Sequence, residues 1–155
     1  MKRIKNAWAS HPGYQCFGCC HDNHSGLQMD FYEDGDEIIS VWKPRPEYQG
    51  WINVLHGGIQ ATLADEIASW VVFRKLQTTG MTAKMEIRYK KSISTNDDHI
   101  TLRAHLVSFQ HNLANIEVLI LNEKDEVCAT AQCVYSVVPP EKAKTEGFKE
   151  FEVEE

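Results

Sequence analysis

The sequence predicts an α+β fold in which an antiparallel sheet covers one long helix. Only residues 58–76 have apolar side chains at helical spacing over several turns. Much of the remaining chain alternates apolar and polar residues, as the strands of a half-buried sheet do. Turn-forming residues such as Asp34-Gly35-Asp36 separate the alternating segments, so neighbouring strands are expected to run antiparallel.

The N-terminal third is expected to hold a short helix and then a β-hairpin. The helix is predicted over residues 3–11, because Pro12 follows and cannot continue it. Residues 27–31 and 38–42 alternate apolar and polar side chains on either side of a turn, so they are the predicted strands. Two prolines then open a loop of about ten residues that leads to the long helix.

The long helix is predicted from the spacing of its apolar residues. Ile59, Leu63, Ile67, Trp70 and Val71 recur three and four positions apart. Further alanines and aliphatic residues widen this surface until it nearly surrounds the helix, so the helix is expected to be buried on most sides.

Four strands in a meander are predicted after the helix, over residues 83–90, 100–106, 114–120 and 127–138. In the first of them Ala83, Met85, Ile87 and Tyr89 alternate with charged residues, so these four are expected to share one face.

Length and composition bound the kind of protein. A chain of 155 residues is expected to form one domain, here residues 1–140, with residues 141–155 as a charged tail that is solvated or loosely docked. The net charge is −6 and no basic block occurs, which argues against a nucleic-acid partner. No apolar run reaches ~18 residues and no signal peptide is apparent, so no membrane contact is expected. Five cysteines, an odd number, favour a reducing cytoplasm over a disulfide framework.

The start of the long helix carries the strongest chemical signal. His56-Gly57-Gly58 opens it, and Asp65 follows seven residues after the second glycine. Glycines let another molecule approach the unpaired N–H groups, which hold the positive end of the helix dipole. Since seven residues are about two helical turns, Asp65 lies on the same helix face as Gly58. A polarising group and a carboxylate along one line suit attack on a carbonyl.

Several motifs accompany this segment. Cys16-Phe17-Gly18-Cys19 precedes Gly26-Leu27, and Tyr48-Gln49-Gly50-Trp51 precedes the His-Gly-Gly triplet. Together with residues 55–65 and Thr82, they resemble the His-Gly-Gly branch of the hotdog-fold thioesterases, the phenylacetate-pathway type. The resemblance extends over roughly residues 14–138. It implies the hotdog fold, an antiparallel sheet wrapped around one central helix.

The resemblance also implies an activity, which is hydrolysis of an acyl thioester, usually acyl-CoA, without a cofactor. The backbone of Gly57 or Gly58 would polarise the thioester carbonyl. Asp65 from a second subunit would attack directly or activate water. His56 would position the thioester, and Thr82 would orient the water or the carboxylate. A homodimer or tetramer with the site at the subunit interface is therefore expected.

The loop before the triplet departs from the family pattern. Many members carry Asn six residues before the His and Gly three residues before it, where this chain has Gly50 and Asn53. Gln49 or Asn53 could replace the missing Asn as a substrate-binding group. Further substrate contacts are expected from Arg88, Lys90 and Lys91, whose charges suit the phosphates of coenzyme A. The alternative is that these five side chains are ordinary solvated loop and strand residues.

Three alternatives stay open at this point. Glu66 points about 100° away from Asp65 and is interpreted as a surface or interface charge. No metal site is expected; the alternative is zinc bound by Cys16 and Cys19 with His21 and His24. The alternative function is a non-catalytic acyl-CoA-binding protein, whereas a hotdog hydratase is disfavoured because Asn-Pro does not precede His56.

Overall fold

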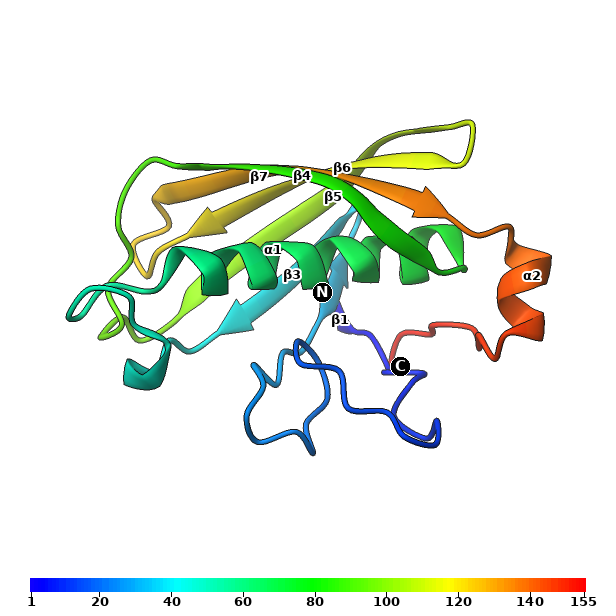
Figure 1. Ribbon diagram of the computed structural model, residues 1–155, viewed down its shortest axis with the longest axis horizontal. Coiled ribbons are helices and arrows are strands. Elements are labelled where there is room, and N and C mark those ends of the chain that lie inside the picture. Colours follow the sequence, from blue (N-terminus) through cyan, green and yellow to red (C-terminus); the bar gives the residue numbers. More distant parts are fainter.

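Seven antiparallel strands form one sheet that curves over one side of a long helix (Figure 1). The computed structural model describes residues 1–155. The strands, in sheet order, are β1 (Lys2–Arg3), β2 (Tyr32–Asp34), β3 (Glu37–Trp42), β5 (Ile100–Gln110), β6 (Leu113–Leu121), β7 (Val127–Val137) and β4 (Gly80–Tyr89). The helices are α1 (Gly57–Val71), which continues as a π-helical turn over Val72–Leu76, a 3-10 turn at Pro46–Tyr48, and α2 (Pro140–Thr145). The predicted α+β hotdog fold is confirmed.

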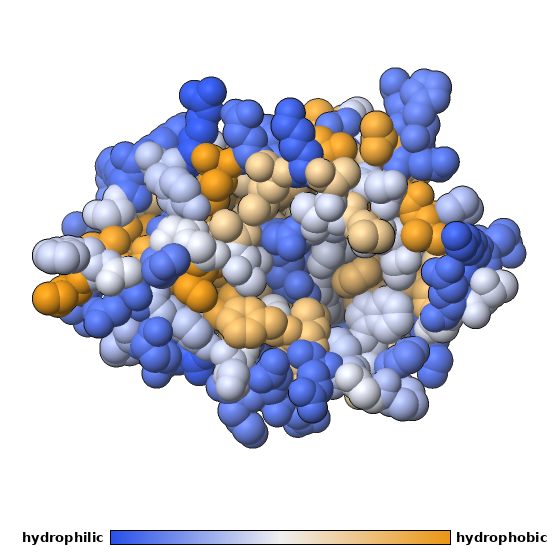
Figure 2. Space-filling view, viewed as in Figure 1, coloured by the Kyte–Doolittle hydropathy of each residue, from blue (hydrophilic) through white to orange (hydrophobic).

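The core forms where α1 faces the sheet. Leu63, Ile67 and Trp70 on α1 are buried, as are Leu102 on β5 and Val118 on β6. This is the apolar stripe that the helical spacing predicts. The opposite side of α1 is only half-buried, however. The sheet of one chain therefore does not bury the helix on most sides, which is the burial that its apolar surface predicts. Figure 2 shows this side, where hydrophobic and weakly polar residues surround a hollow with hydrophilic residues at its centre.

The N-terminal segment differs from its prediction. Residues 3–11 are not helical, because their backbone bonds to distant segments instead: Ile4 N–H donates to the Phe31 carbonyl and Lys5 N–H to that of Glu152. Tertiary bonds of this kind outweigh a helix too short to be stable alone. The first strand of the hairpin is also later than predicted. Residues 27–31 form no strand, and Gln28 has a left-handed backbone conformation, although Met29 keeps the predicted inward orientation and is buried.

The segment after residue 140 is firmly docked against the core, and is neither solvated nor loosely attached as predicted. Phe151 is fully buried and stacks on Phe73, with ring centroids 4.8 Å apart. It also packs edge-on against Trp70 and Trp8. Aromatic pairs of this kind add stability beyond the area they bury. The charges of the segment had suggested a tail, whereas two phenylalanines three residues apart, Phe148 and Phe151, hold it in place.

Replacing Phe151 with Ala is therefore expected to destabilise the fold by about 3 kcal/mol, because it leaves a cavity among aromatic side chains. The measurement is the free energy of unfolding in urea. Lys149→Ala, on an exposed side chain of the same segment, is the matched control and should change stability little. Equal stability of the two variants would show that the segment does not contribute to the core.

Strand β4 has two features that matter for the site. It pairs only with β7, so its other edge is free and lies at the end of the sheet. It also has a β-bulge between Thr82 and Lys84, which leaves Ala83 without a partner. Ala83 is exposed and does not join the predicted inward row; Thr82 takes the inward position instead. A bulge changes which residues of a strand face the core in this way.

None of the helices is long and apolar enough to cross a lipid bilayer.

Candidate active site

The His-Gly-Gly triplet forms the N-terminus of α1. His56 caps the helix: its Nδ1 accepts a hydrogen bond from the Gly58 N–H at 2.8 Å. The hydroxyl of Tyr89 on β4 donates to the Gly57 carbonyl at 2.6 Å and so fixes the orientation of that peptide. The Gly57 N–H makes no hydrogen bond within the chain. An unpaired N–H at the positive end of a helix is a donor for an anion or a polarised carbonyl.

Asp65 lies two turns further along α1 and is held by two hydroxyl groups. Thr82 Oγ1 and the Tyr135 hydroxyl donate to Asp65 Oδ1 at 2.7 Å and 2.6 Å. Asp65 Oδ2 makes no hydrogen bond within the chain. Burial is the main cause that raises the pKa of the Tyr135 phenol above its usual range, so this hydroxyl stays a donor. One carboxylate oxygen is thus anchored and the other is available.

The two hydroxyls come from paired positions of adjacent strands. Thr82 on β4 lies directly opposite Tyr135 on β7, so both side chains emerge on the side that faces α1. The bulge after Thr82 makes this pairing possible. Tyr135 and Tyr89 were missed by sequence reasoning, because their roles depend on strand register and on contacts with residues 70 and 32 positions away. The sequence holds no local signal for either.

Two hollows flank the start of α1 and gather most of the predicted residues. One, about 350 Å³, is lined by His56, Gly58, Gln49 and Thr62. The other, about 310 Å³, is lined by Gly57, Tyr89, Lys90 and Lys91 together with Gln60. Lys91 forms an ion pair with Glu126 at 2.6 Å, whereas Lys90 has no ion-pair partner. The helix start therefore opens to one hollow lined by the His and to another lined by two lysines.

Two of the predicted substrate-binding residues lie outside these hollows. Asn53 has a left-handed backbone conformation and lines a separate depression beside Asp97. Its N–H already donates to Gln49 Oε1 at 3.1 Å and is not free to donate to a substrate. Gln49 thereby braces the loop before the triplet. Arg88 projects from β4 with its side chain 77% exposed and lies 3.7 Å from Glu86, apart from both hollows.

Residues 52–129 of the chain match the model of the thioesterase superfamily. The chain belongs to this family. The match includes the His-Gly-Gly triplet, Asp65 and Thr82, but ends before Tyr135. No curated protein matches the sequence significantly.

Solved structures of other thioesterase-superfamily proteins share the fold. A thioesterase from Haemophilus influenzae is 20% identical with a TM-score of 0.65, over 74% of this chain and 80% of that chain. A hypothetical thioesterase from Streptococcus pneumoniae, solved with coenzyme A, is 22% identical with a TM-score of 0.66, over 71% and 88%. A Streptococcus mutans protein bound to acetyl-CoA is 20% identical with a TM-score of 0.66, over 71% and 88%. Two further structures of the S. pneumoniae protein carry an Asp-to-Ala or a Thr-to-Ala substitution.

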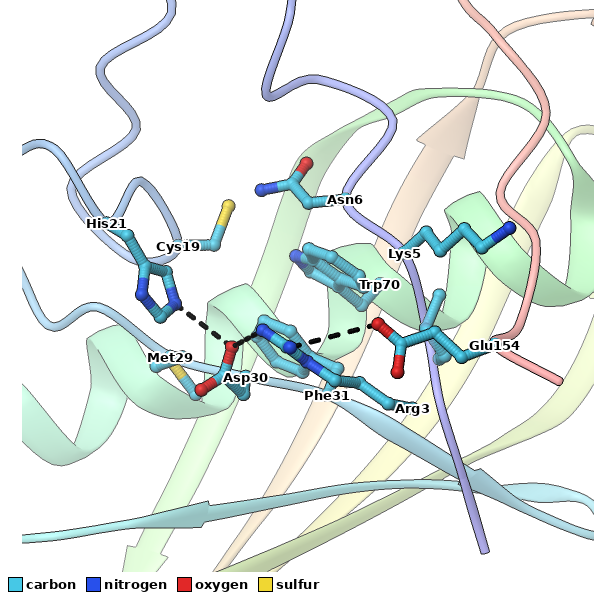
Figure 3. Close-up of a pocket in the computed structure, with 11 residues that line it drawn as sticks. Arg3, Lys5, Asn6, Cys19, His21, Met29, Asp30, Phe31, Trp70 and Glu154 are labelled. Carbon is cyan, nitrogen blue, oxygen red and sulfur yellow. Dashed lines mark hydrogen bonds and ion pairs between the residues drawn. The ribbon is translucent and has the colours of Figure 1, made fainter.

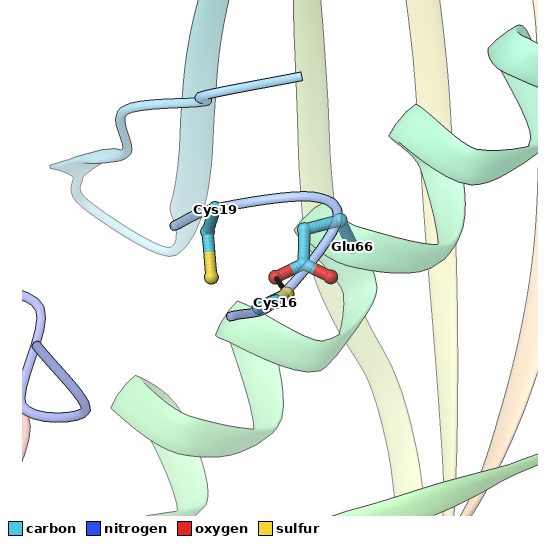
Figure 4. Close-up of side chains that lie close together, drawn as sticks. All are labelled: Cys16, Cys19 and Glu66. Atoms are coloured by element: carbon cyan, nitrogen blue, oxygen red, sulfur yellow. Dashed lines mark hydrogen bonds between the residues drawn. The ribbon is translucent and has the colours of Figure 1, made fainter. Parts of the chain in front are cut away.

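A cluster of Cys16, Cys19 and Glu66 joins the N-terminal loop to α1 (Figure 4). The Cys16 thiol donates to Glu66 Oε1 at 3.3 Å, and so does the Trp70 indole N–H at 3.3 Å. A hydrogen bond from the Cys19 thiol lowers the pKa of Cys16 to about 5, whereas burial raises the pKa of Glu66 to about 8. Glu66 is therefore not the surface charge that its position after Asp65 suggests.

The histidines near these cysteines do not join the cluster. His21 Nε2 lies 3.0 Å from the Asp30 carboxylate, and His24 is exposed. Asp30 belongs to a hollow of about 200 Å³ near the chain termini, where Arg3 bridges it to Glu154 (Figure 3). These ion pairs occupy the charged groups of that hollow, and none of the residues predicted for catalysis lines it.

Proposed function

We propose that this member of the thioesterase superfamily is an acyl-CoA thioesterase that hydrolyses its substrate to a free acid and CoA. The observation that carries the proposal is the pairing of two features on α1. The Gly57 N–H at the helix start has no partner, and Asp65 has one anchored and one available oxygen. These are the groups that acyl transfer needs, a donor for the oxyanion and a base or nucleophile.

The Gly57 N–H is the better placed oxyanion donor. The Gly58 N–H is already occupied by His56, so it serves to hold the imidazole at the mouth of the site. A thioester carbonyl at the Gly57 N–H would also lie at the positive end of α1, which stabilises the negative charge as it develops. The bond from Tyr89 to the Gly57 carbonyl holds the next peptide, whose N–H donates to His56, and so supports the start of the helix.

The carboxylate must come from a second subunit. Gly58 and Asp65 are seven residues apart, or about 10 Å along the helix, which is too far for Asp65 to reach a carbonyl at its own helix start. The half-buried side of α1 and the free edge of β4 supply a surface on which two copies could pair. We therefore propose a homodimer, alone or paired into a tetramer, with each site shared between subunits.

In the proposed reaction, Asp65 of the partner subunit attacks the thioester carbon, or removes a proton from a water that attacks it. The carbonyl oxygen becomes an oxyanion at the Gly57 N–H. Collapse of this intermediate breaks the C–S bond, and CoA leaves as a thiolate that takes up a proton. Direct attack gives an anhydride with Asp65 that water then hydrolyses. Thr82 and Tyr135 act as positioning residues in both routes, since they hold Oδ1.

The lysines of the second hollow favour CoA as the leaving group. Lys90 and Lys91 lie with Gly57 in one depression, so phosphates bound there would be connected to a thioester at the helix start. Structures of two relatives contain coenzyme A or acetyl-CoA. The Asp and Thr that are substituted in the S. pneumoniae protein are also the residue types hydrogen bonded here. We place the protein in the cytoplasm, because all five of its cysteines are unpaired.

The test is turnover of a panel of acyl-CoA esters, from acetyl to long-chain and aromatic, followed by the release of free thiol. Hydrolysis of at least one ester well above the rate without protein is expected. Calorimetric binding of the same esters distinguishes the alternative function. Tight binding of an acyl-CoA with no turnover of any ester would identify a non-catalytic acyl-CoA-binding protein.

Tyr135→Phe is expected to lower turnover about 10-fold, less than loss of the carboxylate, because Thr82 still holds Oδ1. The loss should appear in kcat with little change in KM, since the hydroxyl does not face the CoA groups. Removing both hydroxyls, in Thr82→Val with Tyr135→Phe, should cost more than the two single losses combined. An unchanged kcat in the double variant would exclude a positioning role.

The protein is expected to run as a dimer of about twice 17.7 kDa in light scattering at micromolar concentration. Met81 on β4 is 75% exposed, and a charge there would be forced into the proposed contact. Met81→Asp should therefore shift the protein toward monomer and lower turnover together. Val107→Asp on β5, another exposed apolar position away from the β4 edge, is the control. A fully active monomer would contradict the shared site.

A further inference from the structure

The cluster of Cys16, Cys19 and Glu66 has no role in the proposed hydrolysis, although the fold holds its three side chains close together. Its three possible ligand atoms all lie within 4.8 Å of one another. In Figure 4 the two thiols and the carboxylate point toward a common space between the N-terminal loop and α1. Side chains that surround one zinc ion at about 2.0–2.3 Å are separated by comparable distances.

The carboxylate in this cluster is without a compensating cation. The hydrogen-bond partners of Glu66 are the Cys16 thiol and the Trp70 indole, and neither is positively charged. No Lys, Arg or His forms an ion pair with Glu66, whereas the carboxylates of Glu33 and Glu126 each form one. Burial of a carboxylate beside two thiols is costly unless a cation or protons neutralise the group.

The loop is shaped to hold the cysteines against the carboxylate. A Cβ on Gly18, between the two cysteines, would lie 2.5 Å from the Glu66 side chain, so only glycine lets the loop come this close. The Cys20 N–H donates to the Cys16 carbonyl at 3.1 Å, which closes the turn around both cysteines. Cys-x-x-Cys turns of this kind present two sulfur atoms to one metal ion.

Outer contacts orient the ligand atoms. Asn6 donates to the Tyr14 hydroxyl at 2.8 Å, and that hydroxyl lies 2.7 Å from Cys19 Sγ. The hydroxyl thereby holds the Cys19 side chain in place. The Trp70 indole does the same for the Glu66 carboxylate. Hydrogen bonds to the ligands are typical of metal sites, where they fix orientation and tune affinity.

We infer that Cys16, Cys19 and Glu66 bind a zinc ion that ties the N-terminal loop to α1. Two thiolates and one carboxylate favour Zn²⁺ over Mg²⁺ or Ca²⁺, which take oxygen ligands. A hollow of about 270 Å³, lined by Tyr14, Ser69 and Phe73, adjoins the three side chains and leaves room for water as the fourth ligand. The inferred ion lies outside the proposed active site, and its binding does not depend on thioester hydrolysis.

The test is binding of zinc alone to the full-length protein, reduced and stripped with a chelator, in competition with a chromogenic indicator. About one zinc per chain is expected. Cobalt in place of zinc should give the sulfur-to-metal charge-transfer band and the strong visible bands of a tetrahedral thiolate site. Cys16→Ser and Glu66→Gln should each weaken zinc binding by at least ~100-fold, the upper end of the effect of losing a mere outer contact.

The control is Cys128→Ser, which removes a buried cysteine outside the cluster and should bind zinc as tightly as the unaltered chain. Glu66→Gln keeps the shape and the indole contact, so it answers the question even where Cys16→Ser fails to fold. Reduced protein that binds no zinc would overturn the inference, as would zinc binding unchanged by Glu66→Gln. Formation of a Cys16–Cys19 disulfide by oxidised glutathione, in protein that binds no zinc, would identify a redox pair instead.

Discussion

Asp65→Asn is expected to lower the turnover of acyl-CoA by at least ~10²-fold, the lower end of what general-base loss costs. The amide keeps the shape of the side chain and can still accept hydrogen bonds from Thr82 and Tyr135. It can neither attack a carbonyl carbon nor take a proton from water. Binding of the substrate should stay largely intact, so the loss should fall on kcat rather than KM.

Asp36→Asn, on an exposed carboxylate in the β2–β3 turn, is the matched control and should leave turnover unchanged. Asp65→Glu should recover only part of the activity, because the longer side chain moves its oxygens away from the two hydroxyls. Near-normal turnover of Asp65→Asn would refute the proposed chemistry. Glu66, the next carboxylate on α1, would then be the residue to test.

Gly58→Val is expected to abolish turnover, with a loss of at least ~10²-fold, comparable to removal of an oxyanion donor. A Cβ on Gly58 would lie 3.0 Å from Cε1 and Nδ1 of His56, so the imidazole must leave its capping position. The added methyl groups would also cover the helix start, where the thioester must approach. The fold should survive, because Gly58 is exposed. Turnover and the thermal midpoint are measured together.

Ala61→Val on the same turn of α1 separates these effects. It adds a β-branched residue to the helix, with its small helix-propensity cost, but Ala61 does not line the hollow that His56 and Gly58 line. This variant is expected to remain active. Retained turnover in a well-folded Gly58→Val protein would mean that the carbonyl binds elsewhere. The Gly57 N–H would then lose its proposed role.

Elements with a strong internal period could be predicted from the sequence. The apolar spacing of residues 58–76 gave α1 and its π-helical end within one residue, and the alternation after residue 83 gave β5, β6 and β7. The helix predicted for residues 3–11 was wrong, because their conformation depends on hydrogen bonds to Phe31 and Glu152, which no local pattern encodes. The docking of Phe151 could not be predicted for the same reason, since charged residues dominate the sequence around it.

The candidate site was predictable where it is local. His56, Gly57, Gly58 and Asp65 lie within ten residues, and helical geometry alone relates them. Tyr135 was not predictable, because its contact with Asp65 requires the register of β7 against β4. The contact of Cys16 with Glu66 spans 50 residues of sequence, and the spacing of the cysteines drew attention to the nearby histidines instead.

The bulge in β4 has a consequence for finding such sites in other sequences. Ala83 adds one residue to the strand without moving Thr82 from its place opposite Tyr135. Because Ala83 follows Thr82, a chain that lacked it could keep the same hydroxyl against the same carboxylate, with the interval from the Thr to the residue at the Tyr89 position one residue shorter. A search for relatives by a fixed interval between Thr82 and Tyr89 would therefore separate proteins whose sites superpose. Alignments of this family are better anchored on the inward-facing row of the strand than on residue counts.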